Sequence, residues 1–288
     1  MKVRVVLVLA VIAIAAGCQF ESPTRLGLAS TVPSPGGQTS PALETAQAGG
    51  PAAALTIYAA ASLQVALQTI AASYEAGHPG TTLTISTGSS AALATQIEQG
   101  APADVFLSAD ITNPRKLVDK GLADGDPVNF AGNHLVIAVP ADNSAGLASP
   151  ADLARPGLKV IAAGDDVPIT TYATQVVGLL AKLPGYPAGF SAAYAANVVS
   201  KEDDVQAVIT KIELGEGDAA IVYLTDARGS STVSAIAIPA EADIAAVYAG
   251  AVLNDSPNLA AAHAFLDWMT GAEAQLILAQ LGFTEPAS

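Results

Sequence analysis

Two segments of the sequence place a serine between a short apolar strand and an amphipathic helix. Leu55-Thr56-Ile57-Tyr58 precedes Ser62, and Leu83-Thr84-Ile85-Ser86 precedes Ser90. Apolar residues then recur at helical spacing, namely Leu63, Ala66, Leu67, Ile70 and Tyr74 after Ser62, and Leu93 and Ile97 after Ser90. A helix start offers unpaired N–H groups and the positive end of the helix dipole beside the serine hydroxyl. The pattern therefore predicts two anion-binding turns that use no cationic side chain.

Strand and helix patterns alternate along the rest of the chain. Expected strands are 103–108, 135–139, 159–162, 197–199, 219–223 and 233–238; expected helices are 114–120, 170–183, 258–269, 272–281 and one from Asp203 or Asp204 to Gly215. This alternation is typical of α/β proteins with mostly parallel sheets and helices on both faces. Ligands of such folds bind at the carboxyl ends of strands, where we expect the binding loops.

The first residues carry the pattern of a secretory signal. Lys2 and Arg4 precede the apolar run 5–16, which is too short for a permanent membrane helix, so residues 1–17 predict a signal peptide. Ala15-Ala16-Gly17-Cys18 resembles a bacterial lipobox, which implies that Cys18 is lipidated and becomes the N-terminus. The alternative is an ordinary small-residue cleavage site followed by an incidental cysteine.

Residues 18–53 predict a flexible tether. Pro, Ser, Thr, Gly, Ala and Gln dominate them, and they show no periodic apolar face. A tether beyond a lipid-modified cysteine would keep a folded domain close to a membrane partner. Because Cys18 is the only cysteine, an internal disulfide is excluded.

Charge and motif spacing exclude several classes of function. The net charge of −14 leaves no basic patch for nucleic acid. An acidic protein repels anions at long range, so anion binding must depend on short-range hydrogen bonds. His78, His134 and His263 lack the spacing of metal ligands. No Gly-x-Ser-x-Gly elbow points to a serine hydrolase.

Two more loops and one tyrosine offer further neutral donors. Pro168 fits the first turn of a helix, which would leave the N–H groups of Ile169 and Thr170 free. Asp203 or Asp204 is a natural N-cap, which would leave the N–H of Val205 exposed. The strand that ends at Tyr223 contributes a phenol. These groups and the two serine turns are suited to a tetrahedral oxyanion.

From Leu55 to Phe283, the chain resembles the molybdate-binding proteins of bacterial ABC importers. The resemblance rests on these stretches: 58–63 (Tyr-Ala-Ala-Ala-Ser-Leu), 96–110 (with Gly-Ala-Pro-Ala-Asp at its centre), Val167-Pro168, 202–205 (Glu-Asp-Asp-Val), 221–223 (Ile-Val-Tyr) and 282–284 (Gly-Phe-Thr). It implies that Ser62 and Ser90 bind the oxyanion through hydroxyl and backbone N–H groups. Ile169 and Val205 would contribute backbone N–H groups, and Tyr223 its hydroxyl. Whether Ser89 shares the role of Ser90 stays open.

The resemblance also implies a fold and a function. The fold is the two-lobed type II periplasmic binding protein fold, in which each lobe has a mixed, mostly parallel sheet flanked by helices and two strands form the hinge. Lobe one would comprise residues 54–136 and 240–288, and lobe two residues 137–239. No catalytic residue, cofactor or direct metal-cation ligand is implied.

The resemblance implies a monomer that is lipid-anchored through Cys18 and lies in the periplasm or on the outer face of the cytoplasmic membrane. It would capture molybdate or tungstate between its lobes and deliver the anion to an ABC permease with its ATPase subunit. The alternatives are a binding protein for another oxyanion such as sulfate, a ferric-ion binding protein, and an enzyme with a nucleophilic serine.

Overall fold

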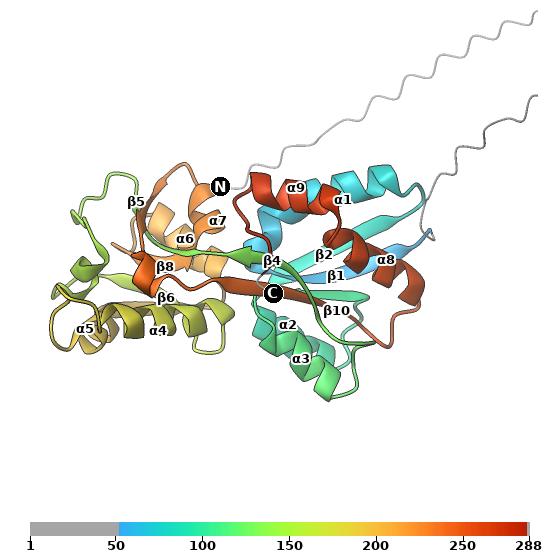
Figure 1. Cartoon of the computed structure of the whole chain (residues 1–288), viewed down its shortest axis with the longest axis horizontal. Coiled ribbons are helices and arrows are strands. Elements are labelled where there is room, and N and C mark those ends of the chain that lie inside the picture. Colours follow the sequence, from blue (N-terminus) through green and yellow to red (C-terminus); the bar gives the residue numbers. More distant parts are fainter. Residues whose placement is uncertain (1–51, 287–288) are drawn as a thin grey trace, which may run out of the picture. The chain divides into compact units, whose positions relative to one another are not determined.

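The computed structural model describes residues 52–286 (Figure 1). The predicted signal peptide, the lipidation site Cys18 and all but the end of the predicted tether lie outside the described residues. Within the described part, no helix is long and apolar enough to cross a membrane.

The first sheet has five strands in the order β2-β1-β3-β10-β4. They are β1 (Ala54–Ala60), β2 (Thr82–Gly88), β3 (Val105–Ser108), β4 (Val128–Asn133) and β10 (Ala246–Val252). Strand β1 runs parallel to β2 and β3, whereas β10 is antiparallel to β3 and β4. Figure 1 shows α1 (Gln64–Gly77), α8 (Leu259–Met269) and α9 (Ala272–Gln280) on one face of this sheet, and α2 (Ser90–Glu98) and α3 (Thr112–Asp119) on the other.

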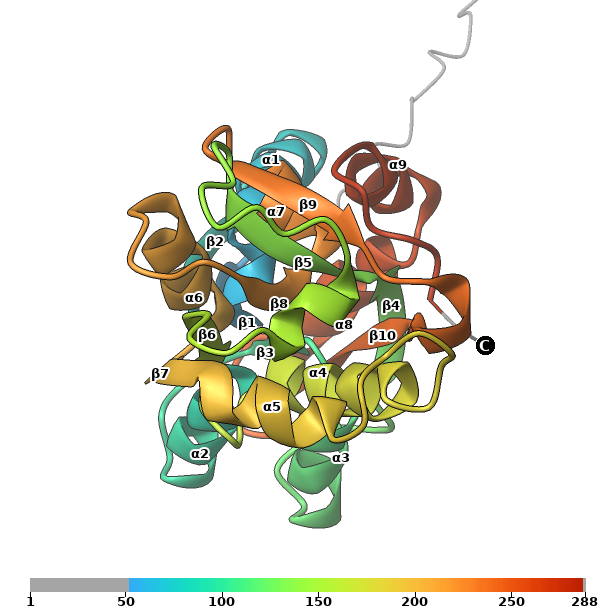
Figure 2. The same ribbon diagram turned by 90° about the vertical axis from the view of Figure 1, so that its left-hand side faces the viewer.

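The other five described strands form a second group, made of a three-stranded sheet and a two-stranded sheet. Strands β8 (Ala220–Tyr223), β5 (Leu135–Pro140) and β9 (Val233–Ala237) form an antiparallel sheet, and β6 (Val160–Ala163) pairs in parallel with β7 (Val198–Glu202). A bridge between Val160 and Ala219 joins β6 to the start of β8. Figure 2 shows these strands in the order β9, β5, β8, β6 and β7. Four helices lie next to them: α4 (Pro168–Leu180), α5 (Phe190–Asn197), α6 (Val205–Glu213) and α7 (Leu224–Arg228).

The chain passes between the two groups of strands twice. It leaves the first sheet after β4, enters the second at β5, and returns between β9 and β10. Single 3-10 turns occupy Ala61–Leu63, Pro150–Ala154 and Ala240–Ala242. The assignment of residues 54–136 plus 240–288 and 137–239 to separate lobes stays a prediction.

The expected alternation of strands and helices is confirmed, but the expected excess of parallel pairing is wrong. Four of the seven strand pairings within the sheets are antiparallel. The strands on either side of the two passages, β4, β5, β9 and β10, account for these antiparallel pairings. The sequence interpretation also missed β4, β10, α5 and α7, whose short segments are rich in alanine, glycine and polar residues.

Apolar side chains of α1 and the central strands form much of the core. Leu55, Ile57 and Leu107 are fully buried in the middle of the first sheet. Helix α1 buries Ala66, Leu67, Ile70 and Tyr74 at the predicted helical spacing. The core thus fixes the start of α1, and with it the turn that holds Ser62.

The C-terminal segment adds a short pairing to the edge strand β4. Gly132 and Thr284 exchange backbone hydrogen bonds of 2.7 and 2.9 Å. A Cβ at Gly132 would contact the Thr284 hydroxyl and lie 2.8 Å from the carbonyl oxygen of Glu285. The close approach of two backbones therefore requires glycine here.

We expect Gly132→Ala to lower the free energy of unfolding by about 1–3 kcal/mol, because the crowded backbone must shift. Gly178→Ala is the control, since Gly178 lies inside α4 with no atom near its Cβ position and should gain about 0.5–1 kcal/mol. Urea unfolding of both variants measures the difference. Unchanged stability of Gly132→Ala would contradict the tight docking of the C-terminal segment.

Candidate functional site

One small pocket is lined by all five residues that the resemblance implied. Ser62, Ser90, Ile169, Val205 and Tyr223 are among its lining residues. They follow the carboxyl ends of β1, β2, β6, β7 and β8, or stand at such an end. The pocket therefore lies where α/β folds place their ligands.

The two serines present their hydroxyl groups in similar ways. Ser62 lies in the turn between β1 and α1, is 6% exposed, and its Oγ accepts a hydrogen bond from the Tyr248 hydroxyl at 2.9 Å. Ser90 begins α2, and its Oγ accepts from the Ala109 N–H at 3.1 Å. Because each oxygen already accepts a hydrogen bond, each hydroxyl proton can be donated to a ligand in the pocket.

Ser89 is a further candidate donor. It is the N-cap of α2 and lines the same pocket, yet its side chain makes no capping hydrogen bond. Its buried Oγ has no partner among the described residues. The sequence offered one signal for it, the adjacent serine in the same turn, but could not tell which hydroxyl points into the pocket.

Two helix starts supply the backbone donors. Ile169 follows Pro168 in the first turn of α4, and Val205 begins α6 behind its N-cap Asp204. The first N–H groups of a helix have no intrahelical partner, so both can bind a ligand. The expectation that the N–H of Thr170 is also free is wrong, because it donates to the Val167 carbonyl at 2.9 Å in a tight first turn.

Tyr223 is a buried neutral donor. It ends β8, it is fully buried, and its Oη has no hydrogen-bond partner among the described residues. The pKa of this phenol is raised well above the usual value, mainly because the side chain is buried. The hydroxyl therefore keeps its proton. An anion in the pocket would give this hydroxyl an acceptor.

Among the described residues, no cationic side chain lines the pocket. One carboxylate, that of Asp204, is among the lining groups, and its Oδ1 accepts the N–H of Ala207 at 2.9 Å as a helix cap. Helix starts and neutral hydroxyls therefore provide the attraction for an anion.

The three histidines lie away from this pocket. His78 stacks on Tyr74, and His134 and His263 pair with Asp243 and Asp124. None of them lines the pocket with Ser62 and Ser90, so no imidazole base accompanies these hydroxyls. In residues 52–286, no group of three or more His, Cys, Asp or Glu side chains could hold a metal ion.

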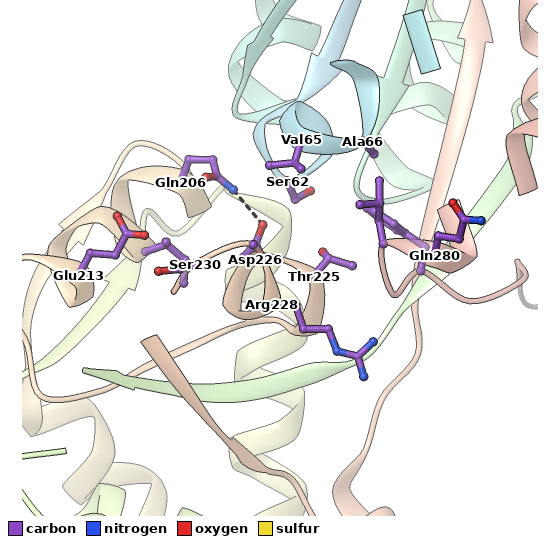
Figure 3. A pocket seen from close by; sticks show the side chains of 14 residues that line it. Ser62, Val65, Ala66, Gln206, Glu213, Thr225, Asp226, Arg228, Ser230 and Gln280 are labelled. Carbon is purple, nitrogen blue, oxygen red and sulfur yellow. Dashed lines mark hydrogen bonds between the residues drawn. The ribbon is translucent and has the colours of Figure 1, made fainter. Parts of the chain in front are cut away.

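A second pocket also borders Ser62 (Figure 3). Asp226 of α7 lies in it, and the Gln206 amide donates to its Oδ1 at 2.9 Å. The buried Oδ2 has no partner among the described residues. Burial is the main reason why the pKa of Asp226 is raised well above its usual value, and the carboxyl is therefore protonated over a wider pH range.

Comparison with known proteins decides the family. Residues 55–284 match the family described as bacterial extracellular solute-binding protein. The chain belongs to this family. The match spans both groups of strands and includes every residue of the candidate site. Membership of a family of solute-binding proteins agrees with the prediction of a binding protein and not an enzyme.

Individual relatives have more specific names. The chain is 36% identical over 251 residues to the molybdate-binding protein of Mycobacterium tuberculosis H37Rv, covering 87% of this chain and 92% of the relative. It is 34% identical to a putative ABC transporter substrate-binding lipoprotein of Bacillus subtilis, and the match covers 80% of this chain and 86% of that relative. Among solved structures, the periplasmic molybdate-binding protein of Azotobacter vinelandii superposes with a TM-score of 0.67 at 27% identity, covering 81% of this chain and 100% of that protein. The two-lobed periplasmic binding protein fold predicted from the sequence is thus confirmed.

The raised pKa of Asp226 predicts a pH-dependent cost in stability. The folded state binds this proton more tightly than the unfolded chain, so stability should fall as pH rises from the ordinary aspartate pKa to the raised one. Asp226→Asn stays neutral and can keep the hydrogen bond from Gln206. Its free energy of unfolding should follow that of wild type at low pH. Within that pH window it should exceed the wild-type value by a margin that grows by up to about 1.4 kcal/mol per pH unit.

Urea unfolding at several pH values tests this expectation, with Asp255→Asn at an exposed position as the matched control. Parallel stability profiles for Asp226→Asn and wild type would show that Asp226 ionises normally in the fold.

Proposed function

We propose that the pocket binds a tetrahedral oxyanion, molybdate or tungstate, and that the chain is the substrate-binding component of an ABC importer. The observation that carries the proposal is a pocket in which helix starts and buried hydroxyls converge and which no cationic side chain of residues 52–286 lines. The names of the molybdate-binding relatives support the same ligand. The name of the Bacillus subtilis relative supports the partner, an ABC permease with its ATPase subunit.

Donor chemistry explains which anions the pocket would accept. Ser62, Ser90 and Tyr223 offer hydroxyl protons, and Ile169 and Val205 offer N–H groups. A fully ionised oxyanion accepts all of these hydrogen bonds. Hydrogen phosphate carries an O–H that would face donors, and such an unpaired buried group costs about 1–3 kcal/mol. Sulfate has the right charge and is smaller, so the size of the closed pocket must reject it.

The anion would also act on the conformation of the protein. Ser62 and Ser90 follow strands of the first sheet, while Ile169 and Val205 follow strands of the second group and Tyr223 ends one of them. A ligand held from both sides favours a closed arrangement over an open one. The permease would recognise this closed form of the monomer.

The N-terminal segment would keep the protein close to its partner. We infer that residues 1–17 are removed as a signal peptide and that Cys18 is lipidated, on the strength of the lipobox-like Ala15-Ala16-Gly17-Cys18. Residues 18–53 would then tether the binding domain outside the cytoplasmic membrane. The lipoprotein name of the Bacillus subtilis relative supports this inference.

Calorimetric titration of the chain without its signal peptide tests the function. We expect tight one-to-one binding of molybdate and tungstate, and far weaker binding of sulfate and hydrogen phosphate. Preference for sulfate would replace the proposed ligand with the alternative oxyanion. No response to any of the four anions would contradict the proposal and make ferric iron, with its tyrosinate absorbance, the next ligand to test.

Substitutions at the proposed donors test the position of the site. Tyr223→Phe should weaken molybdate binding by about 1–2 kcal/mol, because one buried hydrogen bond is lost. Val205→Pro should cost more, since it removes a backbone donor at a helix position that tolerates proline. Tyr58→Phe and Val205→Ala are the matched controls, because neither removes a proposed donor. Equal affinity of all four variants would mean that the anion binds elsewhere.

A further inference from the structure

A buried chain of hydrogen bonds runs from Asn133 to the proposed anion pocket. The Asn133 Nδ2 donates to the Thr225 hydroxyl at 2.9 Å and to the Tyr248 hydroxyl at 3.4 Å. Tyr248 in turn donates to the Ser62 Oγ at 2.9 Å. The chain therefore begins at the end of β4, crosses β10 and ends at a pocket residue.

We propose that Asn133 sets the direction of this chain and thereby makes Ser62 a hydrogen-bond donor to the anion. The inference rests on the proposed function and deepens it, because it names a residue that would select fully ionised oxyanions. A hydroxyl group can donate and accept, so a row of hydroxyls takes its direction from the group at its end. In the orientation that the structure gives the Asn133 amide, its Nδ2 faces both hydroxyls and its buried Oδ1 has no partner among the described residues. An amide nitrogen can only donate, so in this orientation Tyr248 accepts from Asn133 and donates its own proton to Ser62.

The surroundings hold this direction in place. Asn133 and Tyr248 are both 0% exposed, so no bulk water can supply an alternative partner. The backbone of Asn133 pairs with Ala246 in the β4–β10 ladder. The Tyr248 ring contacts the rings of Phe130, Tyr223 and Phe283, at centroid distances of 6.2, 5.6 and 5.5 Å. Both members of the chain are therefore fixed by packing and not by the ligand.

For Ser90, in the other turn, a backbone group determines that the hydroxyl donates its proton toward the pocket. The Ser90 Oγ accepts from the N–H of Ala109, a donor that no side-chain substitution can reverse. Ser62 depends on side chains instead. Asn133 is thus a positioning residue that acts on the anion through Tyr248 and Ser62.

Asn133→Asp tests the proposal because a carboxylate accepts hydrogen bonds in place of the amide N–H groups, and the assay is run at mildly alkaline pH because burial at this position favours the neutral carboxyl. Tyr248 would then donate to residue 133 and accept from Ser62, whose oxygen would present a lone pair to the pocket. Hydrogen phosphate can donate to that lone pair, whereas sulfate cannot. The two anions are of similar size, and both are divalent at mildly alkaline pH, so their ratio cancels the general effect of an added negative charge.

The measurement is the displacement of bound molybdate by hydrogen phosphate and by sulfate, in wild type, Asn133→Asp and Asn129→Asp. Asn129 is the matched control, since it lies on the same strand and makes no hydrogen bond to Tyr248. We expect the phosphate-to-sulfate affinity ratio to rise about tenfold in Asn133→Asp and to stay at the wild-type value in Asn129→Asp. A general loss of structure would lower both affinities and leave the ratio unchanged.

An unchanged ratio in a folded Asn133→Asp protein that binds molybdate overturns the inference and leaves the proposed function intact. Failure of wild type to bind molybdate overturns both. If Asn133→Asp does not fold, Tyr248→Phe provides the second test. It removes the donor to Ser62 and should weaken molybdate and sulfate binding about fivefold, with Tyr74→Phe as the control, because Tyr74 is buried in α1 and does not line the pocket. Full affinity of Tyr248→Phe overturns the inference.

Discussion

The site depends on unpaired hydrogen-bond donors at the starts of helices. An α/β fold places these starts at the carboxyl ends of its strands, and here the starts of α2, α4 and α6 meet the turn after β1 in one pocket. Each start contributes N–H groups that the helix itself cannot satisfy. A protein with a net charge of −14 can thereby attract an anion at short range, although no lysine or arginine in the described part of the chain lines the pocket.

Burial keeps these donors in the protonation state that the site requires. Tyr223 and Tyr248 lie in low-dielectric surroundings that raise the pKa of both phenols, so both retain their protons. Asp226, close by in the second pocket, is affected in the same direction. The hydroxyl donors around the place where a divalent anion would sit are therefore neutral, and the one lining carboxylate, that of Asp204, accepts the N–H of Ala207 as a helix cap.

Some of this arrangement could be predicted from the sequence, because it depends on local patterns. The serines after two strands, Pro168 in a first turn and Asp204 as an N-cap are recognisable from neighbouring residues alone. Strand β10 was missed because Ala249-Gly250-Ala251 lacks the bulky residues that mark a strand. The two passages of the chain between the sheets, and the antiparallel pairing that they bring, depend on contacts that are distant in sequence.

The hydrogen-bond chain behind Ser62 could not be predicted at all. Asn133 and Tyr248 are 115 residues apart, and Tyr248 and Ser62 are 186 residues apart. Neither Asn133 nor Tyr248 belongs to a motif, and each would pass for an ordinary strand residue. Only the pairing of β4 with β10 brings them together behind the pocket.

The most direct test of the account is a crystal structure of the protein with molybdate, in which anomalous scattering locates the molybdenum. The account predicts a single strong peak between Ser62, Ser90 and Tyr223, with every oxygen of the anion contacted by N–H or O–H donors. A peak elsewhere, or a carboxylate oxygen of Asp204 or Asp226 in contact with the anion, would contradict it.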